Sequence, residues 1–140
     1  MIPKRRVLIL CAGNSARSQM AEGLLRSMAG DRLDIFSAGT RPAGLNPNAV
    51  AAMAELGIDI SGYRSKSVDE FRGQEFDYVL TVCDGAKETC PVFPGHARQI
   101  HHDFEDPAVA PVDVQLTVFR KVRDELREWL GALVASMYDK

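Results

Sequence analysis

The stretch Val7-Leu8-Ile9-Leu10-Cys11-Ala12-Gly13-Asn14-Ser15-Ala16-Arg17-Ser18 decides the fold of this chain. Residues 6–10 form a short run rich in leucine and β-branched side chains, which is typical of a buried parallel strand. Small and polar residues follow and predict a loop. Apolar residues then recur at helical spacing, at Met20, Leu24, Leu25 and Met28, and Gly30 supplies a stop. The stretch therefore predicts a strand, a loop and a helix.

The alternation of strands and helices continues along the chain. Further strands are predicted at 33–37, 77–82 and 98–102, and further helices from Pro47 to a cap at Gly57 and from about 112 to 137. A single helical turn is predicted at 68–71, and no helix is predicted in the polar stretch 83–94. This order predicts an α/β fold: one domain over residues 1–140, built as a three-layer sandwich with a four-stranded parallel sheet and flanking helices.

The composition excludes several classes of protein. The 140 residues are 46% hydrophobic and 26% charged, so intrinsic disorder is excluded. The formal net charge is −2, and no basic cluster exceeds Lys4-Arg5-Arg6, so neither a nucleic acid nor an anionic membrane is an expected partner. The first apolar run is too short for a signal peptide, and we expect a cytoplasmic monomer. Three cysteines do not suggest a disulfide framework.

The loop after the first strand has the residues of an oxyanion site. Its small side chains let successive backbone N–H groups converge on one point, and the following helix adds its positive end. Arg17 offers a planar fork to two oxygens of a tetrahedral anion, and Ser18 can donate a further hydrogen bond. The same positive field favours the thiolate of Cys11, which would attack the central atom of the anion. The bland alternative is a buried cysteine and a surface arginine. The expected substrate-binding residues are Ala12, Gly13, Asn14, Ser15, Ala16, Arg17 and Ser18.

Two further cysteines bear on the reaction. Cys83 follows the third predicted strand, and Cys90 lies seven residues later. A phosphatase needs only the thiolate of Cys11, whereas a reductase must move two electrons, which two more thiols could supply by disulfide exchange. The spacing does not match a zinc site, so no metal or other cofactor is expected. From the spacing alone, two unreactive thiols are an equal alternative.

The loop resembles the phosphate-binding loop of the low-molecular-weight protein tyrosine phosphatases. More narrowly, Arg17-Ser18-Gln19-Met20-Ala21-Glu22 resembles their relatives, the thioredoxin-coupled arsenate reductases. The resemblance extends through Ser37-Ala38-Gly39, Asn46-Pro47 and Glu105-Asp106-Pro107, and so over nearly the whole chain. It implies an arsenate reductase in which Cys11 attacks arsenate and Cys83 then attacks Cys11 to expel arsenite. By the same analogy Cys90 then attacks Cys83, and thioredoxin reduces the final Cys83–Cys90 disulfide.

The resemblance also gives Asp106 a role, that of the general acid that protonates the leaving oxygen. Phosphatases of the family carry aromatic residues after this Asp-Pro pair, whereas this chain continues with residues 108–111, Ala-Val-Ala-Pro. A small inorganic oxyanion, arsenate or phosphate, fits that sequence better than a phosphotyrosine. Two alternatives stay open: a tyrosine phosphatase with a cysteinyl-phosphate intermediate, and a non-catalytic oxyanion or redox sensor.

A last expectation concerns potassium, which some of these reductases bind. Asn14, Glu22 and Ser37 match the potassium-binding positions, but Lys66 stands where a further acidic ligand would fall. An ammonium group near Glu22 could replace the cation, so we expect no potassium requirement. The alternatives are that Lys66 is an exposed lysine, or that Asp69 takes the acidic position. The histidines, His96, His101 and His102, are interpreted as ordinary polar residues.

Overall fold

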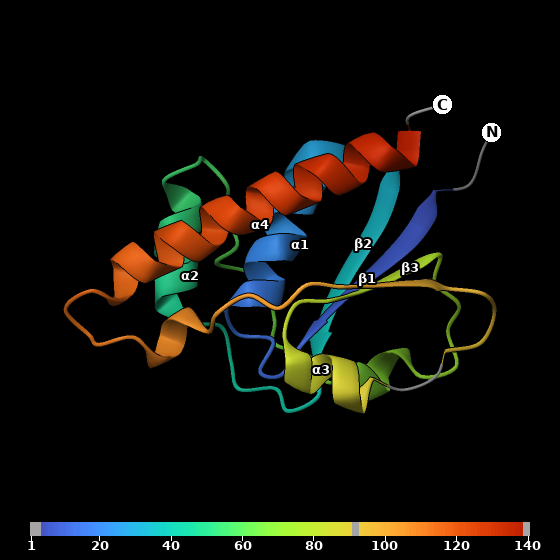
Figure 1. Cartoon of the computed structure of the whole chain (residues 1–140), viewed down its shortest axis with the longest axis horizontal. Helices are drawn as coiled ribbons and strands as arrows, with labels where there is room; N and C mark the ends of the chain where they lie inside the picture. The colour runs from blue at the N-terminus through green and yellow to red at the C-terminus, as the bar shows by residue number, and fades with distance from the viewer. Residues whose placement is uncertain (1–3, 91–92, 139–140) are drawn as a thin grey trace.

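The computed structural model describes residues 4–90 and 93–138, and its centre is a parallel sheet. The strands lie in the order β2-β1-β3-β4, of which Figure 1 labels the first three. Their bounds are Arg5–Cys11 for β1, Leu33–Gly39 for β2, Tyr78–Thr81 for β3 and Arg98–His101 for β4. All three strand pairs are parallel, which confirms the predicted four-stranded sheet.

Helices flank the sheet on both sides. They are α1 (Arg17–Ala29), α2 (Pro47–Ala54), α3 (Asp84–Thr89) and α4 (Gln115–Tyr138), with short 3-10 turns η1 (Val68–Phe71) and η2 (Pro107–Val109). The long helix α4 packs along α1 and α2, whereas α3 lies apart from these three (Figure 1). Among the helices of the described residues, none has the length and apolar character that a bilayer crossing requires.

Alternate residues of β2 show the two faces of the sheet. Ser37 donates a hydrogen bond to Glu22 of α1, so this side of the strand faces α1. Phe36 points to the opposite side, where its ring lies 5.7 Å from that of Phe71 in η1 and 6.0 Å from that of Phe76. The sheet is thus covered by an α1 layer on one face and by an aromatic layer around η1 on the other.

The structure corrects the prediction for the polar stretch 83–94, where it contains the helix α3. Cys83 is the N-cap, and its sulfur accepts a hydrogen bond from the N–H of Ala86 at 3.4 Å. Asp84 in the first turn adds a negative charge at the positive end of the helix. Cysteine is not a usual capping residue, which explains why the pattern gave no signal here.

One predicted helix end also differs from the observed one. The second helix ends at Ala54, three residues before Gly57, although Gly57 still makes the turn with a φ of 75°. Glu55 follows the helix and binds α4 instead: Arg120 and Arg123 both donate to its carboxylate. These two guanidinium groups lower the pKa of Glu55 to about 2. The pair of arginines fixes α4 against the end of α2.

Candidate active site

The site lies at the carboxyl ends of β1 and β3, which are neighbours in the sheet. Leu10 pairs with Thr81, and the N–H of Val82 donates to the carbonyl of Leu10 at 3.0 Å. Cys11 ends β1 and Cys83 follows β3 by two residues, so the two cysteines leave the sheet at the same edge. Both are buried. Ligands of parallel α/β sheets bind at this edge.

The loop Cys11–Ser18, hereafter the oxyanion loop, turns its carbonyl groups outward. Each carbonyl from residue 11 to residue 16 accepts a hydrogen bond from another segment or from α1, at 2.8 to 3.3 Å. The acceptor and donor pairs are Cys11 with Thr40, Ala12 with Arg41, Gly13 with Ala43, Asn14 with Gln19, Ser15 with Asn46, and Ala16 with Met20.

The outward carbonyls determine where the N–H groups point. In a trans peptide the C=O and the following N–H point in opposite directions, so the N–H groups of residues 12–17 turn inward. No hydrogen bond among the described residues has its donor at the N–H of residues 13–16. These converging donors are what a tetrahedral oxyanion requires, as the small residues of the loop predict.

Gly39 and Asn14 allow the loop to curl this tightly. A Cβ atom at Gly39 would lie 2.6 Å from the carbonyl oxygen of Ala12 and 2.8 Å from the backbone nitrogen of Asn14, so only glycine fits. Asn14 has a φ of 46°, the left-handed region that asparagine tolerates better than most residues. The end of β2 and one strained residue together shape the loop.

The Asn14 side chain orders the hydroxyl groups around Cys11. Its Nδ2 donates to Ser18 Oγ at 2.7 Å and to Ser37 Oγ at 3.0 Å. Because Ser18 Oγ accepts from Asn14, its own proton is available to Cys11 Sγ, which lies 3.0 Å away. The Asn14 side chain thus holds a hydroxyl group against the sulfur of Cys11.

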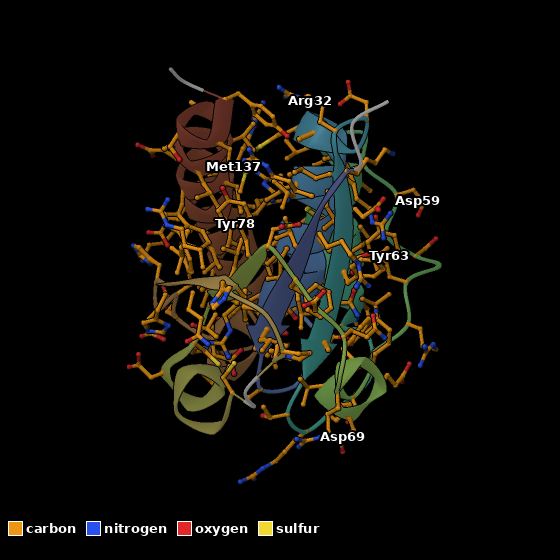
Figure 2. All side chains as sticks on the ribbon, turned by 90° about the vertical axis from the view of Figure 1, so that its right-hand side faces the viewer. Arg32, Asp59, Tyr63, Asp69, Tyr78 and Met137 are labelled. Atoms are coloured by element: carbon orange, nitrogen blue, oxygen red, sulfur yellow. The ribbon has the colours of Figure 1, made fainter. Side chains whose placement is uncertain are left out.

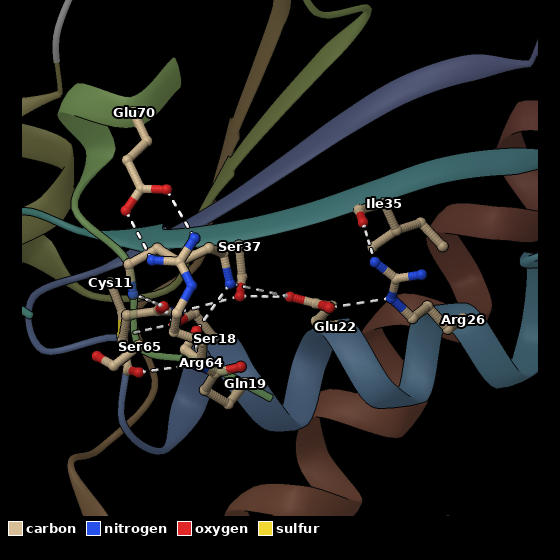
Figure 3. Close-up of polar contacts among 12 residues, drawn as sticks. Cys11, Ser18, Gln19, Glu22, Arg26, Ile35, Ser37, Arg64, Ser65 and Glu70 are labelled. Atoms are coloured by element: carbon tan, nitrogen blue, oxygen red, sulfur yellow. Dashed lines mark hydrogen bonds and ion pairs between the residues drawn. The ribbon is translucent and has the colours of Figure 1, made fainter. Parts of the chain in front are cut away.

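The same chain of hydrogen bonds continues into α1, as Figure 3 shows. Ser37 donates to Glu22 Oε1 at 2.6 Å, and Arg26 donates to the other carboxylate oxygen at 2.9 Å. Lys66 Nζ lies 4.0 Å from Glu22 Oε1 and donates to the carbonyl of Arg64. Burial lowers the pKa of Lys66, and the charge of Glu22 opposes that effect. The buried Glu22 is thus balanced by two cations.

The lysine occupies the position that the sequence suggested for it, beside Glu22. Its side chain is only 15% exposed, so it is not the exposed lysine of the alternative interpretation. Asp69, the other candidate for the acidic position, pairs with Arg72 and lies at the outer edge of the molecule (Figure 2).

Gln19 and residues 64–65 complete the support of the loop, and sequence reasoning missed them. Gln19 Nε2 lies within 3.0 to 3.1 Å of the Asn14 carbonyl, Asn14 Oδ1 and the Arg64 carbonyl. Ser65 donates to the carbonyl of Gly13 at 3.0 Å. These contacts join segments about fifty residues apart, so local patterns give no signal for them. Arg64 itself is anchored by two hydrogen bonds to Glu70 (Figure 3).

Arg17, which begins α1 after the oxyanion loop, lies close to Asp106, the N-cap of η2. Arg17 donates to the carbonyl of Phe104 at 2.9 Å, and its other terminal nitrogen lies 3.8 Å from Asp106 Oδ2. Asp106 caps η2 by accepting a hydrogen bond from the N–H of Ala108, and its side chain is 40% exposed. The structure therefore brings together the guanidinium and the carboxyl group that the sequence assigned to the site.

Cys83 and Cys90 bound α3 at its two ends. Cys83 is the N-cap and Cys90 the C-cap, and all three cysteines are present as thiols. At the rise of an α-helix, seven residues separate the two Cα atoms by about 10 Å. A disulfide needs Cα atoms within about 7 Å. Burial raises the pKa of the half-buried Cys90 thiol. The structure therefore brings Cys83 to the same sheet edge as Cys11, and the length of α3 separates Cys90 from Cys83.

Comparison with known proteins gives consistent results. The sequence model of the family "Low molecular weight phosphotyrosine protein phosphatase" matches residues 6–140. The arsenate reductase of Halalkalibacterium halodurans is 46% identical over 125 residues, which cover 88% of this chain and 90% of that protein.

Two solved structures extend the comparison. An arsenate reductase in its oxidized state superposes with a TM-score of 0.76 at 31% identity, covering 94% of this chain and 98% of the other. A thioredoxin-dependent arsenate reductase of Corynebacterium glutamicum superposes with a TM-score of 0.67 at 30% identity, covering 96% of this chain and 64% of the other.

Proposed function

This chain belongs to the low molecular weight phosphotyrosine protein phosphatase family, and within that family we propose that it is an arsenate reductase with a three-thiol relay. The observation that carries the proposal is the pairing of two thiols at one sheet edge. Cys11 lies in a loop whose backbone donors suit an oxyanion, and Cys83 leaves the neighbouring strand beside it. Hydrolysis needs only the first thiol, whereas a two-electron reduction needs further thiols.

In the first step the Cys11 thiolate attacks the arsenic atom of arsenate. A sulfur–arsenic bond forms, and one oxygen leaves as water after protonation. Asp106 is the proposed proton donor, and Arg17 releases its contact with Phe104 to bind two arsenate oxygens. Ser18 Oγ, 3.0 Å from Cys11 Sγ, positions the sulfur for this attack.

In the second step the Cys83 thiolate attacks the sulfur of Cys11. The Cys11–Cys83 disulfide forms, the sulfur–arsenic bond breaks, and its electron pair stays on arsenic, which leaves as arsenite. In the third step Cys90 attacks Cys83 and releases Cys11 as a thiolate. Because α3 keeps Cys90 about 10 Å from Cys83, this helix must lose its turns before the last disulfide can form.

The final Cys83–Cys90 disulfide needs an external dithiol, and we propose thioredoxin for that role. The similarity to a protein described as a thioredoxin-dependent arsenate reductase supports this choice. We further propose that the chain, as one domain over residues 1–140, works as a monomer in the cytoplasm, where such reductants operate.

Thiol mapping tests the proposal directly. The fully reduced protein is exposed to arsenate without reductant, alkylated, digested and analysed by mass spectrometry, with phosphate as the matched control. We expect a Cys83–Cys90 disulfide and one equivalent of arsenite with arsenate only. The Cys90→Ser variant should stop at the Cys11–Cys83 disulfide. If all three thiols stay reduced, the reductase proposal fails and the tyrosine phosphatase alternative becomes the next activity to assay.

A further inference from the structure

His101, at the end of β4, joins the sheet to the first turn of α3. Its Nδ1 lies 2.8 Å from Oγ1 of Thr81 on β3, and its Nε2 lies 2.8 Å from Oδ1 of Asp84, the first residue of α3. An ionised carboxylate only accepts hydrogen bonds, so Nε2 carries a proton and donates it to Asp84. One imidazole therefore ties the start of α3 to two strands.

One cavity is lined both by this imidazole and by Cys90 at the other end of α3. A space of about 280 Å³ is lined by His101, Thr81 and Cys90, together with Val79, Gln99 and Ile100. The side chain of His101 is only 21% exposed, and Thr81 is buried. This histidine is thus not the ordinary polar residue that the sequence suggested, because it contacts the helix that separates the two relay thiols.

The contacts at the start of α3 change in strength during the proposed reaction. In the reduced protein the sulfur of Cys83 caps the helix by accepting from Ala86. Once Cys83 is bonded to Cys11, the geometry of the disulfide directs its sulfur toward Cys11 Sγ, and the cap weakens. Among the ties that hold Asp84 are the bond from His101 and a longer one, 3.2 Å, from the Asp84 N–H to Asp103.

We propose that His101 is a positioning residue for the last thiol exchange, in which its bonds to Thr81 and Asp84 keep α3 helical and delay the meeting of Cys90 with Cys83. The proposal rests on the relay proposed above. In that exchange the Cys90 thiolate attacks Cys83, the Cys83–Cys90 bond forms, and the Cys11–Cys83 bond breaks. Cys11 leaves as a thiolate, the Cys90 proton goes to water, and no net oxidation occurs.

The test measures the exchange separately from the chemistry on arsenic. His101→Ala, Asp84→Ala and the double variant are mixed with arsenate, quenched with alkylating agent over time and mapped for disulfides. We expect the Cys83–Cys90 disulfide to form about three- to tenfold faster in each single variant, since each loses a partly exposed, charge-assisted hydrogen bond. The double variant should be no faster than Asp84→Ala, because His101 acts on α3 through its contact with Asp84.

A second background isolates the earlier steps. With Cys90→Ser added, arsenite release and formation of the Cys11–Cys83 disulfide should occur at the same rate with and without His101→Ala. Hydrogen exchange of the α3 amides in the reduced proteins, without arsenate, should be faster in His101→Ala. His101→Gln, whose amide can also donate to Asp84, should restore most of the protection and guards against a misfolded alanine variant.

The matched control is His102→Ala. This neighbouring histidine stacks on Phe104, with ring centroids 4.3 Å apart, and lies against Trp129 rather than α3. It should leave both the exchange rate and the α3 amides unchanged. Unchanged or slower disulfide formation in His101→Ala overturns the proposal. If the native protein forms no disulfide with arsenate, the relay fails, and the hydrogen-exchange comparison still decides whether His101 holds α3.

Discussion

The oxyanion loop and α3 carry the three cysteines, yet they are held in opposite ways. In the loop, six successive carbonyls and the buried side chains of Asn14, Ser18 and Gln19 are bonded to α1 and the surrounding loops. In α3, six residues are capped by a thiol and tied through Asp84, whose side chain is 69% exposed. The loop has to present the same donors in every cycle, whereas α3 has to come apart in each one.

The difference shows how one small chain combines two mechanical demands. A loop that binds a transition state benefits from donors fixed before the substrate arrives. A helix that must open in each cycle belongs to the low-stability part of the molecule. The predictions that follow concern first the loop and then α3. The last two concern the response to potassium and the ion pairs of Glu55, where we expect small effects on the reaction.

The largest effect is expected for Asn14→Ala. Alanine cannot order Ser18 and Ser37, leaves the N–H of Lys66 without its acceptor at 2.8 Å, and is strained at a φ of 46°. We expect a loss of about 2–4 kcal/mol in the free energy of unfolding and a fall of about 10- to 100-fold in arsenite release. Urea denaturation and single-turnover kinetics measure both.

The matched control for that variant is Asn48→Ala. Asn48 Nδ2 donates to Gln115 Oε1, a contact between the start of α2 and the start of α4. Its removal should cost about 1 kcal/mol or less and leave arsenite release unchanged. Equal losses in both variants would mean that the Asn14 network has no special role.

A smaller effect is expected from Gly85→Ala in α3. No atom lies within 4 Å of a Cβ at Gly85, and Gly85 has no positive φ, so alanine fits and favours the helix by up to about 1 kcal/mol. Formation of the Cys83–Cys90 disulfide should slow by up to about fivefold, since 1 kcal/mol corresponds to that factor. Quenched alkylation after arsenate addition measures it.

The control is Gly131→Ala in α4, where a Cβ is equally unhindered. This variant should stabilise the protein without slowing the disulfide. If the two alanines had the same effect on the disulfide, the helical state of α3 would not limit the exchange.

Potassium is expected to have little effect on the loop. Lys66 already supplies a positive charge 4.0 Å from Glu22 Oε1. The rates of arsenite release in potassium chloride and in sodium chloride of equal ionic strength should therefore differ by less than about 1.5-fold. The ammonium group leaves no site that binds one cation more tightly than the other. Lys66→Asp should acquire a potassium response. Strong activation of the native protein by potassium over sodium would refute this account.

The smallest effect on arsenite release is expected for a substitution at Glu55, which should change only the stability of the fold. Its pKa is lowered to about 2 by Arg120 and Arg123, so its ionised form stabilises the folded state fully above pH 4.5. That contribution is lost as the pH falls from 4.5 towards 2, when the carboxylate is protonated. Acid unfolding followed by circular dichroism should show Glu55→Gln to be less pH-dependent in this window. Identical acid profiles would contradict the assignment.

Much of the fold followed from local patterns. The strand runs, the turn at 68–71 and the common edge of Cys11 and Cys83 depend on periodicity and on the geometry of parallel sheets, which the sequence carries directly. The closeness of Lys66 to Glu22 came from a family resemblance. By contrast, α3 was missed because a thiol caps it. The contacts of Gln19 with Arg64 and of His101 with Asp84 were missed because each needs segments that only folding brings together.

The outward-facing carbonyls of the oxyanion loop have a consequence for selectivity. A site made of backbone donors reads the shape and charge of a tetrahedral anion, not its central atom, so phosphate should occupy it as readily as arsenate. What distinguishes the two is then the fate of the bond to sulfur, because only arsenic accepts the electron pair when Cys83 attacks. Discrimination therefore takes place after binding. Cellular phosphate then competes with arsenate for the loop, and its concentration sets the fraction of enzyme molecules that bind arsenate.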